Sequence, residues 1–168
     1  MNAEYAQGQI FRANDQFRMC KLQVFNWGTF DQLHTVPVSE KGFLFVGRSG
    51  SGKTTLLDAI ATLLVPGKWL HFNAAAQEAD GRGRDRNLVT YIRGAWAAQK
   101  DGGSGEVATR YLRVGTTWSA IALTFRHTDG RVVCLVQLFW IRGNANGNAD
   151  VRRHFMVLER PFDITELN

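Results

Sequence analysis

The chain has 168 residues, of which 45% are apolar and 21% are charged, a composition typical of a soluble globular domain. No run approaches the roughly 18 consecutive apolar residues that indicate a membrane-spanning helix. The polar start of the chain lacks the basic-then-apolar order of a secretion signal. We therefore expect a cytoplasmic protein with no membrane partner. No His or Cys lies near Cys20 or Cys134 at a metal-ligand spacing, so both are interpreted as buried reduced thiols.

The net charge of +5 is unevenly distributed along the chain. Residues 1–80 hold seven basic and seven acidic side chains, whereas residues 81–168 hold thirteen basic and eight acidic ones. Fifteen of the twenty basic residues are arginine, which favours bidentate contacts with phosphate. This bias is compatible with nucleic acid or nucleotide phosphate as a partner. It is equally compatible with a solvated basic surface.

Apolar periodicity predicts the elements of the first half of the chain. Alternation predicts a strand over 18–27 and a second, shorter strand over 33–38, in which Pro37 suggests a sheet edge. The apolar run 41–47 predicts a buried strand that enters a glycine loop. After that loop, apolar residues on one helical face predict a helix that ends at the Pro-Gly pair 66–67.

The second half of the chain is predicted to be rich in β-structure. A polar loop over 73–86 precedes a predicted short helix around 87–98, and the glycine-rich segment 98–106 is predicted to be a loop. Residues 163–166 have the form of a helix N-cap with its partner glutamate, so we interpret the chain as part of a longer protein. β-branched and aromatic residues predict four strands, at 108–114, 119–127, 131–141 and 154–160. A hairpin turn is predicted at 129–130, between the second and third of these strands.

A phosphate-binding loop is the strongest motif of the sequence. Gly47-x4-Gly52-Lys53-Thr54 fits the pattern G-x-x-x-x-G-K-[ST] in full. Its glycines let backbone N–H groups turn toward an anion. Lys53, the predicted catalytic residue, is expected to neutralise the β- and γ-phosphates, while Thr54 binds Mg²⁺. The predicted cofactors are ATP and Mg²⁺, and the predicted cofactor-binding residues of the loop are Gly47, Ser49, Gly50, Ser51, Gly52, Lys53, Thr54 and Thr55.

Other parts of a complete ATPase are not found in this sequence. Hydrolysis commonly uses an Asp-Glu pair after four apolar residues, and that pattern does not occur. The nearest match, at 155–159, lacks the aspartate and is interpreted as an ordinary strand. The GGSG segment at 102–105 has the wrong residue order for an ABC signature motif and is interpreted as a loop. The phosphate loop is therefore expected to be one side of a composite site.

Four segments together resemble the N-terminal head segment of SMC-like ABC-type ATPases. They are NWGTF (26–30), FLFVGRSGSGKTTLLDAIATLLVPG (43–67), WLHFN (69–73) and GRDRNLVTYIRG (83–94). The most similar type is MukB/MksB/JetC, from bacterial condensins and the Wadjet plasmid-defence system. The resemblance covers 17–168 and leaves 1–16 as an N-terminal tail. It implies an α/β P-loop NTPase fold, namely the N-terminal half of an ABC-type head with an antiparallel β subdomain, cut at the start of a coiled-coil arm.

The resemblance also implies a function and a set of partners. In such motors two heads sandwich two ATP molecules, and the missing motifs lie in the C-terminal half-head. ATP hydrolysis then drives DNA translocation or loop extrusion, in plasmid defence or chromosome organisation, at the nucleoid. The isolated chain is expected to be nearly inactive. The implied partners are DNA, a second head in a homodimer, the C-terminal half of its own head, kleisin and accessory subunits, and a nuclease subunit.

Four residues outside the loop take expected roles from the same resemblance. Asn26 and Trp27 are expected near the nucleotide, although core packing is the alternative for Trp27. Arg84 and Arg86 are expected in an arginine loop that touches nucleotide or DNA, and a solvated loop is the alternative. A different class of function also stays open, a stand-alone P-loop enzyme such as a small-molecule or nucleotide kinase with an Arg-rich lid. A nucleotide-binding regulatory fragment without turnover is a third.

Overall fold

A five-stranded antiparallel sheet forms the centre of the molecule, in the order β2-β1-β5-β6-β7. The computed structural model describes residues 16–39, 41–70, 72, 87–100 and 107–167. A separate two-stranded sheet pairs β3 with β4. The strands are β1 (Arg18–Phe25), β2 (Leu33–Pro37), β3 (Ala95–Lys100), β4 (Val107–Tyr111), β5 (Thr117–Arg126), β6 (Val132–Ile141) and β7 (Arg152–Leu158).

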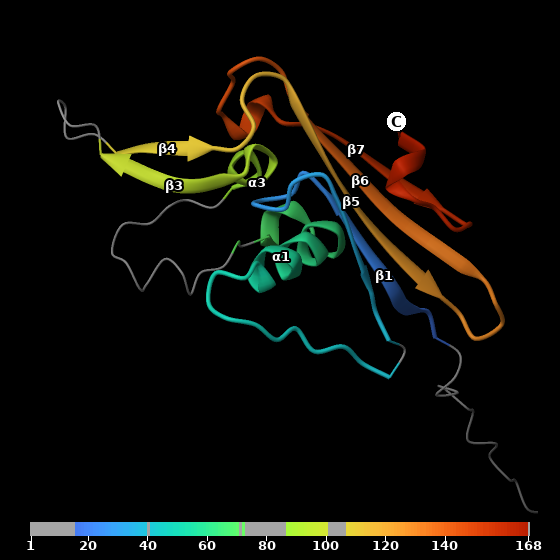
Figure 1. Ribbon diagram of the computed structural model, residues 1–168. Coiled ribbons are helices and arrows are strands. Elements are labelled where there is room, and N and C mark those ends of the chain that lie inside the picture. The colour runs from blue at the N-terminus through green and yellow to red at the C-terminus, as the bar shows by residue number, and fades with distance from the viewer. Residues whose placement is uncertain (1–15, 40, 71, 73–86, 101–106, 168) are drawn as a thin grey trace, which may run out of the picture.

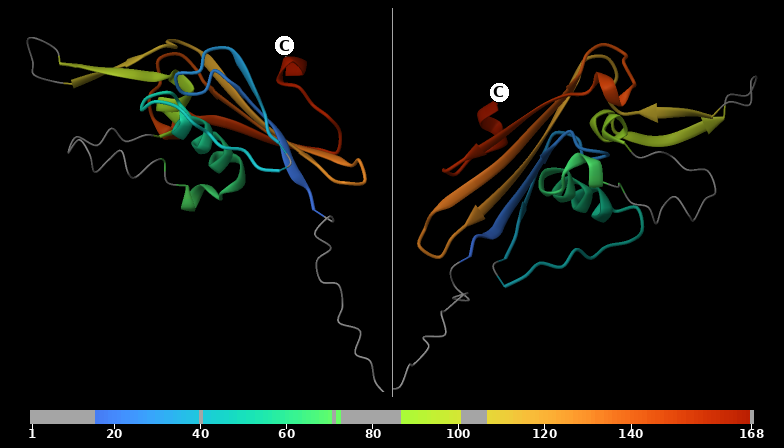
Figure 2. Two further views of the ribbon diagram at one scale, coloured as in Figure 1. Left: turned by 60° about the horizontal axis from the view of Figure 1, so that its bottom comes forward. Right: turned by 180° about the vertical axis from the view of Figure 1, so that it is seen from behind.

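Helices lie on both faces of the large sheet. Figure 1 shows α1 (Lys53–Leu64) and α3 (Leu88–Arg93) on one face, and Figure 2 shows the C-terminal turn η3 (Ile164–Leu167) on the other. Two further short turns are η1 (Gly67–Trp69) and η2 (Asn148–Asp150). Of the helices in the described part of the chain, none combines the length and apolar character needed to cross a membrane.

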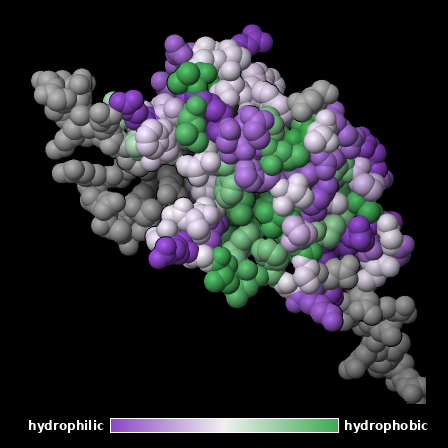
Figure 3. Space-filling view, in the orientation of Figure 1, coloured by the Kyte–Doolittle hydropathy of each residue, from purple (hydrophilic) through white to green (hydrophobic). Residues whose placement is uncertain are grey.

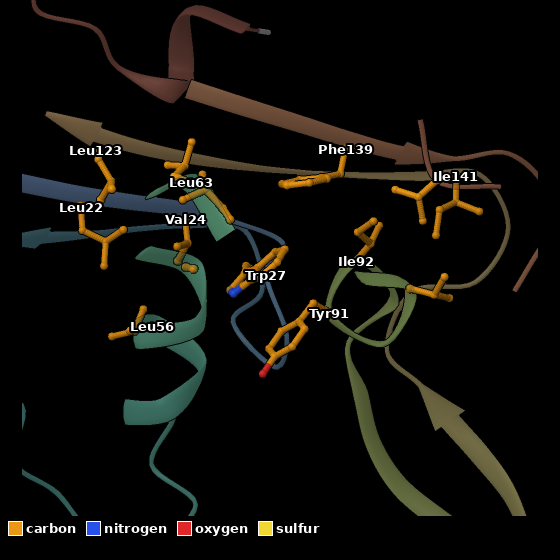
Figure 4. Close-up of a cluster of buried hydrophobic side chains, with 14 residues drawn as sticks. Leu22, Val24, Trp27, Leu56, Leu63, Tyr91, Ile92, Leu123, Phe139 and Ile141 are labelled. Carbon is orange, nitrogen blue, oxygen red and sulfur yellow. The ribbon is translucent and has the colours of Figure 1, made fainter. Parts of the chain in front are cut away.

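Each face of the sheet has its own apolar core because successive side chains of a strand point to opposite faces. On the face of α1 and α3, one cluster is centred on Trp27 and includes Leu22, Ile121 and Phe139 (Figure 4). The intervening residues of β5 and β6 build a smaller cluster on the other face, where Ile164 of η3 packs. The strands predicted over 119–127 and 131–141 are therefore confirmed as β5 and β6, and their alternation fixes which side chains share a face.

Most predicted elements are present near their predicted bounds. The strands over 18–27 and 33–38 are β1 and β2, and β2 lies at an edge of the sheet as Pro37 suggested. The predicted hairpin turn at 129–130 is confirmed, with the His127 backbone N–H donating to the Arg131 carbonyl at 2.9 Å. Cys134 is buried as expected, but Cys20 is partly exposed, and both are free thiols.

The predicted buried strand over 41–47 is wrong. This segment runs as extended chain without strand pairing, and the side chains of Leu44 and Val46 are each 80% exposed. A strand is stabilised by hydrogen bonds to a neighbouring strand, and no described strand pairs with this segment. Figure 3 shows hydrophobic surface on this side of the molecule. Phe43 in the segment and Leu57 in α1 are also exposed hydrophobic residues.

The helix predicted around 87–98 is shorter than expected. It begins at a capping box in which Asn87 Oδ1 accepts from the Thr90 backbone N–H at 3.0 Å and Thr90 Oγ1 accepts from the Asn87 N–H at 3.0 Å. It ends at Gly94, whose φ of 67° is left-handed and typical of a helix C-terminus. Residues 95–100 then form β3, so the predicted loop over 98–106 is wrong at 98–100. The predicted loop over 73–86 and residues 101–106 lie outside the described residues.

Candidate phosphate-binding site

The glycine loop is shaped by two left-handed backbone positions. Gly50 and Gly52 have φ of 81° and 89°, values that side chains with a Cβ rarely adopt. A Cβ on Gly52 would also lie 2.7 Å from Phe30 Cζ. No atom would obstruct a Cβ on Gly50, so the requirement there is purely conformational. Gly52 is therefore required by steric contact with Phe30 as well as by its backbone conformation, whereas Gly50 is required by its backbone conformation alone.

The loop leads directly into the N-terminus of α1. That helix starts at Lys53 with Gly52 as N-cap, which supplies no side-chain hydrogen bond, and no acidic residue lies in the first turn. The first N–H groups of a helix lack intrahelical partners and carry positive partial charge. The 12-residue helix therefore presents uncapped N–H groups at the loop, which is the arrangement that binds phosphate.

Lys53 bends back over the loop that precedes it. Its Nζ donates to the Gly47 carbonyl at 2.7 Å and to the Arg48 carbonyl at 2.8 Å, with Ser51 Oγ at 3.4 Å. None of the described carboxylates forms an ion pair with it. Its charge is thus held by neutral oxygens, and phosphate oxygens would be stronger acceptors.

The hydroxyl side chains of the loop are accessible to solvent to different degrees. Ser49 and Ser51 are exposed, and the side chains of Thr54 and Thr55 are partly exposed. Thr54, predicted to bind Mg²⁺, lies in the first turn of α1 beside Lys53. The described residues hold no cluster of three His, Cys, Asp or Glu side chains that would hold a metal by itself. The magnesium contact of Thr54 stays a prediction.

Trp27 lies behind α1 and not at the loop surface. It is fully buried, its Nε1 donates to the Thr55 carbonyl at 3.0 Å, and its ring stacks on Tyr91 at 4.7 Å between centroids. Gly28 brings the next turn close, since a Cβ there would lie 2.6 Å from Thr55 Cγ2. These contacts tie the first turn of the helix to the sheet, which favours a positioning role for Trp27.

Asn26 shapes the turn between β1 and β2. It adopts a φ of 51°, its Oδ1 accepts from the Gln32 backbone N–H at 2.9 Å and its Nδ2 donates to the Trp118 carbonyl at 3.4 Å. Asparagine tolerates this left-handed conformation better than most residues. Both amide atoms are therefore engaged with the protein backbone. The predicted nucleotide contacts of Asn26 and Trp27 stay predictions, while Arg84 and Arg86 lie outside the described residues.

A buried pair that the sequence did not single out joins α1 to α3. The Tyr91 hydroxyl donates to Asp58 Oδ2, and both side chains are buried. Asp58 also lies one turn after the loop, and its carbonyl accepts from Thr62 Oγ1 at 2.6 Å. In the sequence, this pair is indicated only by an aspartate among the apolar residues of the helix. An aspartate on the exposed face of the helix would give the same pattern.

Two arginines, the buried Arg93 and the partly buried Arg113, brace the backbone behind the site. Arg113 donates through Nη2 to the Gly28 carbonyl at 2.7 Å and through Nε to the Ile92 carbonyl at 2.8 Å. Burial lowers the pKa of the Arg113 guanidinium, and Asp31 opposes that shift. Arg93, 2% exposed, donates to the carbonyls of Gly143 and Ala145, both at 2.8 Å. Part of the arginine excess is therefore structural and does not belong to a phosphate-binding surface.

Residues 19–79, which include the whole loop and α1, match the family model of the P-loop containing region of AAA domains. The chain carries a P-loop. No curated protein matches it. One solved structure, from a study of the structural biochemistry of ATP-driven dimerization and DNA stimulated activation of SMC ATPases, is similar with a TM-score of 0.47 and 18% identity. The similarity covers 89% of this chain and 74% of that one. The predicted fold class, an α/β P-loop NTPase fold with an antiparallel β subdomain, is confirmed.

Proposed function

We propose that this chain is the ATP-binding N-terminal half-head of an SMC-like DNA motor. The P-loop carries the proposal. Within the described part of the chain its lysine is held by neutral oxygens, and it stands beside an uncapped helix N-terminus. Lys53 would bind the β- and γ-phosphates of ATP, Thr54 would bind Mg²⁺, and Thr55 would contact the α-phosphate. Bound ATP supplies the phosphoanhydride bond whose hydrolysis powers the motor.

The segment before the loop supports a composite site. Leu44 and Val46 are each 80% exposed, and the extended backbone from 43 to 47 has no strand partner among the described residues. Apolar extended chain of this kind is stabilised when another strand pairs with it and covers its side chains. We propose that the C-terminal half of the same head supplies this strand, together with the signature and Asp-Glu motifs.

The remaining assembly follows the resemblance to MukB/MksB/JetC-type heads. A second head would close the ATP site in a homodimer, and DNA, kleisin and accessory subunits and a nuclease subunit would complete the complex. The outcome would be DNA translocation or loop extrusion at the nucleoid, in plasmid defence or chromosome organisation. The alternative of a stand-alone P-loop kinase is less well supported, because the described strands form antiparallel sheets without alternating helices.

The experiment compares ATP·Mg²⁺ binding by the chain with that of its Lys53→Ala variant. We expect weak binding by the chain, at least a tenfold further loss in the variant, and almost no hydrolysis by either. Lys41→Ala removes an exposed lysine outside the loop and is the matched control, which should bind as the parent does. Unfolding curves without nucleotide should coincide for all three proteins.

The result of this experiment distinguishes the proposal of a phosphate site at the P-loop from the proposal that the chain is half of a head. Robust turnover by the isolated chain that disappears in Lys53→Ala would contradict the half-head and favour a complete enzyme. Equal ATP binding by parent and Lys53→Ala would contradict the phosphate site itself. A large loss of apo-state stability in Lys53→Ala would contradict the assignment of this lysine to the ligand.

A further inference from the structure

Among the described residues, the core cluster under η3 does not reach one end of the sheet face that carries it. Cross-strand register places Trp118 of β5 opposite Trp140 of β6, and Trp140 opposite Arg152 of β7. The next row on the same face runs from Leu138 to His154. The core cluster of η3 includes contacts with Trp118 but not with Trp140 or Leu138. The two cross-strand rows beside Trp118 hold four further residues. We call this set of four the aromatic row: Leu138, Trp140, Arg152 and His154.

Aromatic rings continue from this row toward the neighbouring strand. Phe25 of β1 stacks on Trp118 with ring centroids 4.2 Å apart and planes at 23°. Phe25, Trp118 and Trp140 are all partly exposed. Three adjacent strands therefore present aromatic side chains on one face, at a strand spacing of about 4.8 Å. A row of flat, accessible rings across a sheet is a surface on which planar groups can stack.

The charged side chains in the strands of this sheet are all basic. Its five strands contain no aspartate or glutamate, while they contain Arg18, Lys21, Arg126, Arg152 and Arg153. At the η3 end of the face, Lys21 is paired with Asp163 at 3.4 Å. At the aromatic end, Arg152 and His154 are exposed, and no described carboxylate forms an ion pair with either. Uncompensated positive charge therefore stands beside Trp140.

We propose that the aromatic row binds single-stranded nucleic acid. Unpaired bases stack on aromatic side chains, and neighbouring cations hold the phosphate backbone. A duplex keeps its bases stacked on one another and offers no base face to Trp140. The site faces away from α1 and the P-loop, because the sheet lies between them (Figure 2). The two proposed sites therefore do not overlap.

The test measures binding of a fluorescein-labelled 15-mer of deoxythymidine and of a 15-base-pair duplex to the full chain in 50 mM salt. We expect the single strand to bind more tightly than the duplex. Trp140→Leu should weaken its binding about tenfold, and Arg152→Gln should weaken it several-fold with a shallower salt dependence. Trp96→Leu, at an exposed tryptophan on β3, is the matched control and should bind as the parent does.

Several outcomes would overturn the proposal. They are absence of single-strand binding by the parent chain, tighter binding of the duplex, or equal effects of Trp140→Leu and Trp96→Leu. Unchanged oligonucleotide binding in both Trp140→Leu and Arg152→Gln would show that the single strand binds elsewhere on the chain. Lys53→Ala should leave single-strand binding intact, so failure of the ATP site and failure of this site are distinguishable. If Trp140→Leu does not fold, the exposed Arg152→Gln decides the question.

Discussion

Replacing Trp27 with phenylalanine tests whether the turn after β1 positions the P-loop helix. Trp27 is fully buried, donates from Nε1 to the Thr55 carbonyl at 3.0 Å, and stacks on Tyr91. Phenylalanine keeps a ring in this stack. It removes the N–H donor and part of the indole volume, so the variant isolates the link between the core and the first turn of α1.

The expected loss of stability is about 2–3 kcal/mol. The lost hydrogen bond contributes about 1 kcal/mol, because the Thr55 carbonyl lies within the helix and still accepts from the N–H four residues later. The unfilled volume beside Tyr91 and Phe139 adds about 1–2 kcal/mol, as in other large-to-small core substitutions. For a chain of this length the sum corresponds to a fall in Tm of roughly 5–10 °C.

The assay is urea unfolding followed by far-UV circular dichroism, with and without ATP·Mg²⁺. Trp69→Phe is the control, because Trp69 is 63% exposed and its replacement should cost less than about 0.5 kcal/mol. Equal losses in Trp27→Phe and Trp69→Phe would refute the positioning role. ATP affinity that Trp27→Phe leaves unchanged would limit the role of Trp27 to the stability of the fold.

Two further predictions concern the backbone behind the site and the acid stability of the fold. Gly94→Ala should cost at least about 2 kcal/mol in urea unfolding, because a left-handed residue with a Cβ costs roughly 1–2 kcal/mol and that Cβ would also lie 2.5 Å from the Gly28 carbonyl oxygen. Gly115→Ala has a similar φ of 72° but open space, so an equal cost in both would contradict the steric part. The pKa of Asp163 is lowered to about 2, chiefly by the Thr165 backbone N–H, so its contribution to stability is complete above about pH 4 and is lost as the pH falls toward 2. Asp163→Asn should flatten the fall in unfolding free energy over that window, and an unchanged pH profile would contradict this origin.

The P-loop and the alternating strands were predictable because their causes are local. Positions 50 and 52 need glycine for the loop conformation itself, and the helix after them follows from spacing of apolar residues on one face. The cap that starts α3 at Asn87 and the hairpin at 129–130 depend likewise on a few neighbouring residues. Elements of this kind are determined by residues within about ten positions of one another in the sequence.

The errors arose where the structure depends on distant partners. The run 41–47 has the composition of a buried strand, but pairing requires a neighbouring strand that the described residues do not provide. Arg93 and Arg113 look like surface cations in sequence, yet their partners are carbonyls up to 85 residues away, such as that of Gly28. For the same reason, the sequence around Trp27 is compatible with both nucleotide contact and core packing.

The unpaired segment and the bent lysine together explain why the isolated chain should bind ATP weakly. Phosphate binding must separate Lys53 Nζ from the Gly47 and Arg48 carbonyls, and those carbonyls lie at the end of an extended segment with no strand partner. The free-energy cost of ordering that segment offsets part of the binding free energy gained from the phosphate contacts. A strand that paired with 43–47 would order Gly47 in advance and reduce this cost. Because coupling between binding events is reciprocal, bound ATP would then strengthen the attachment of that strand to the same degree.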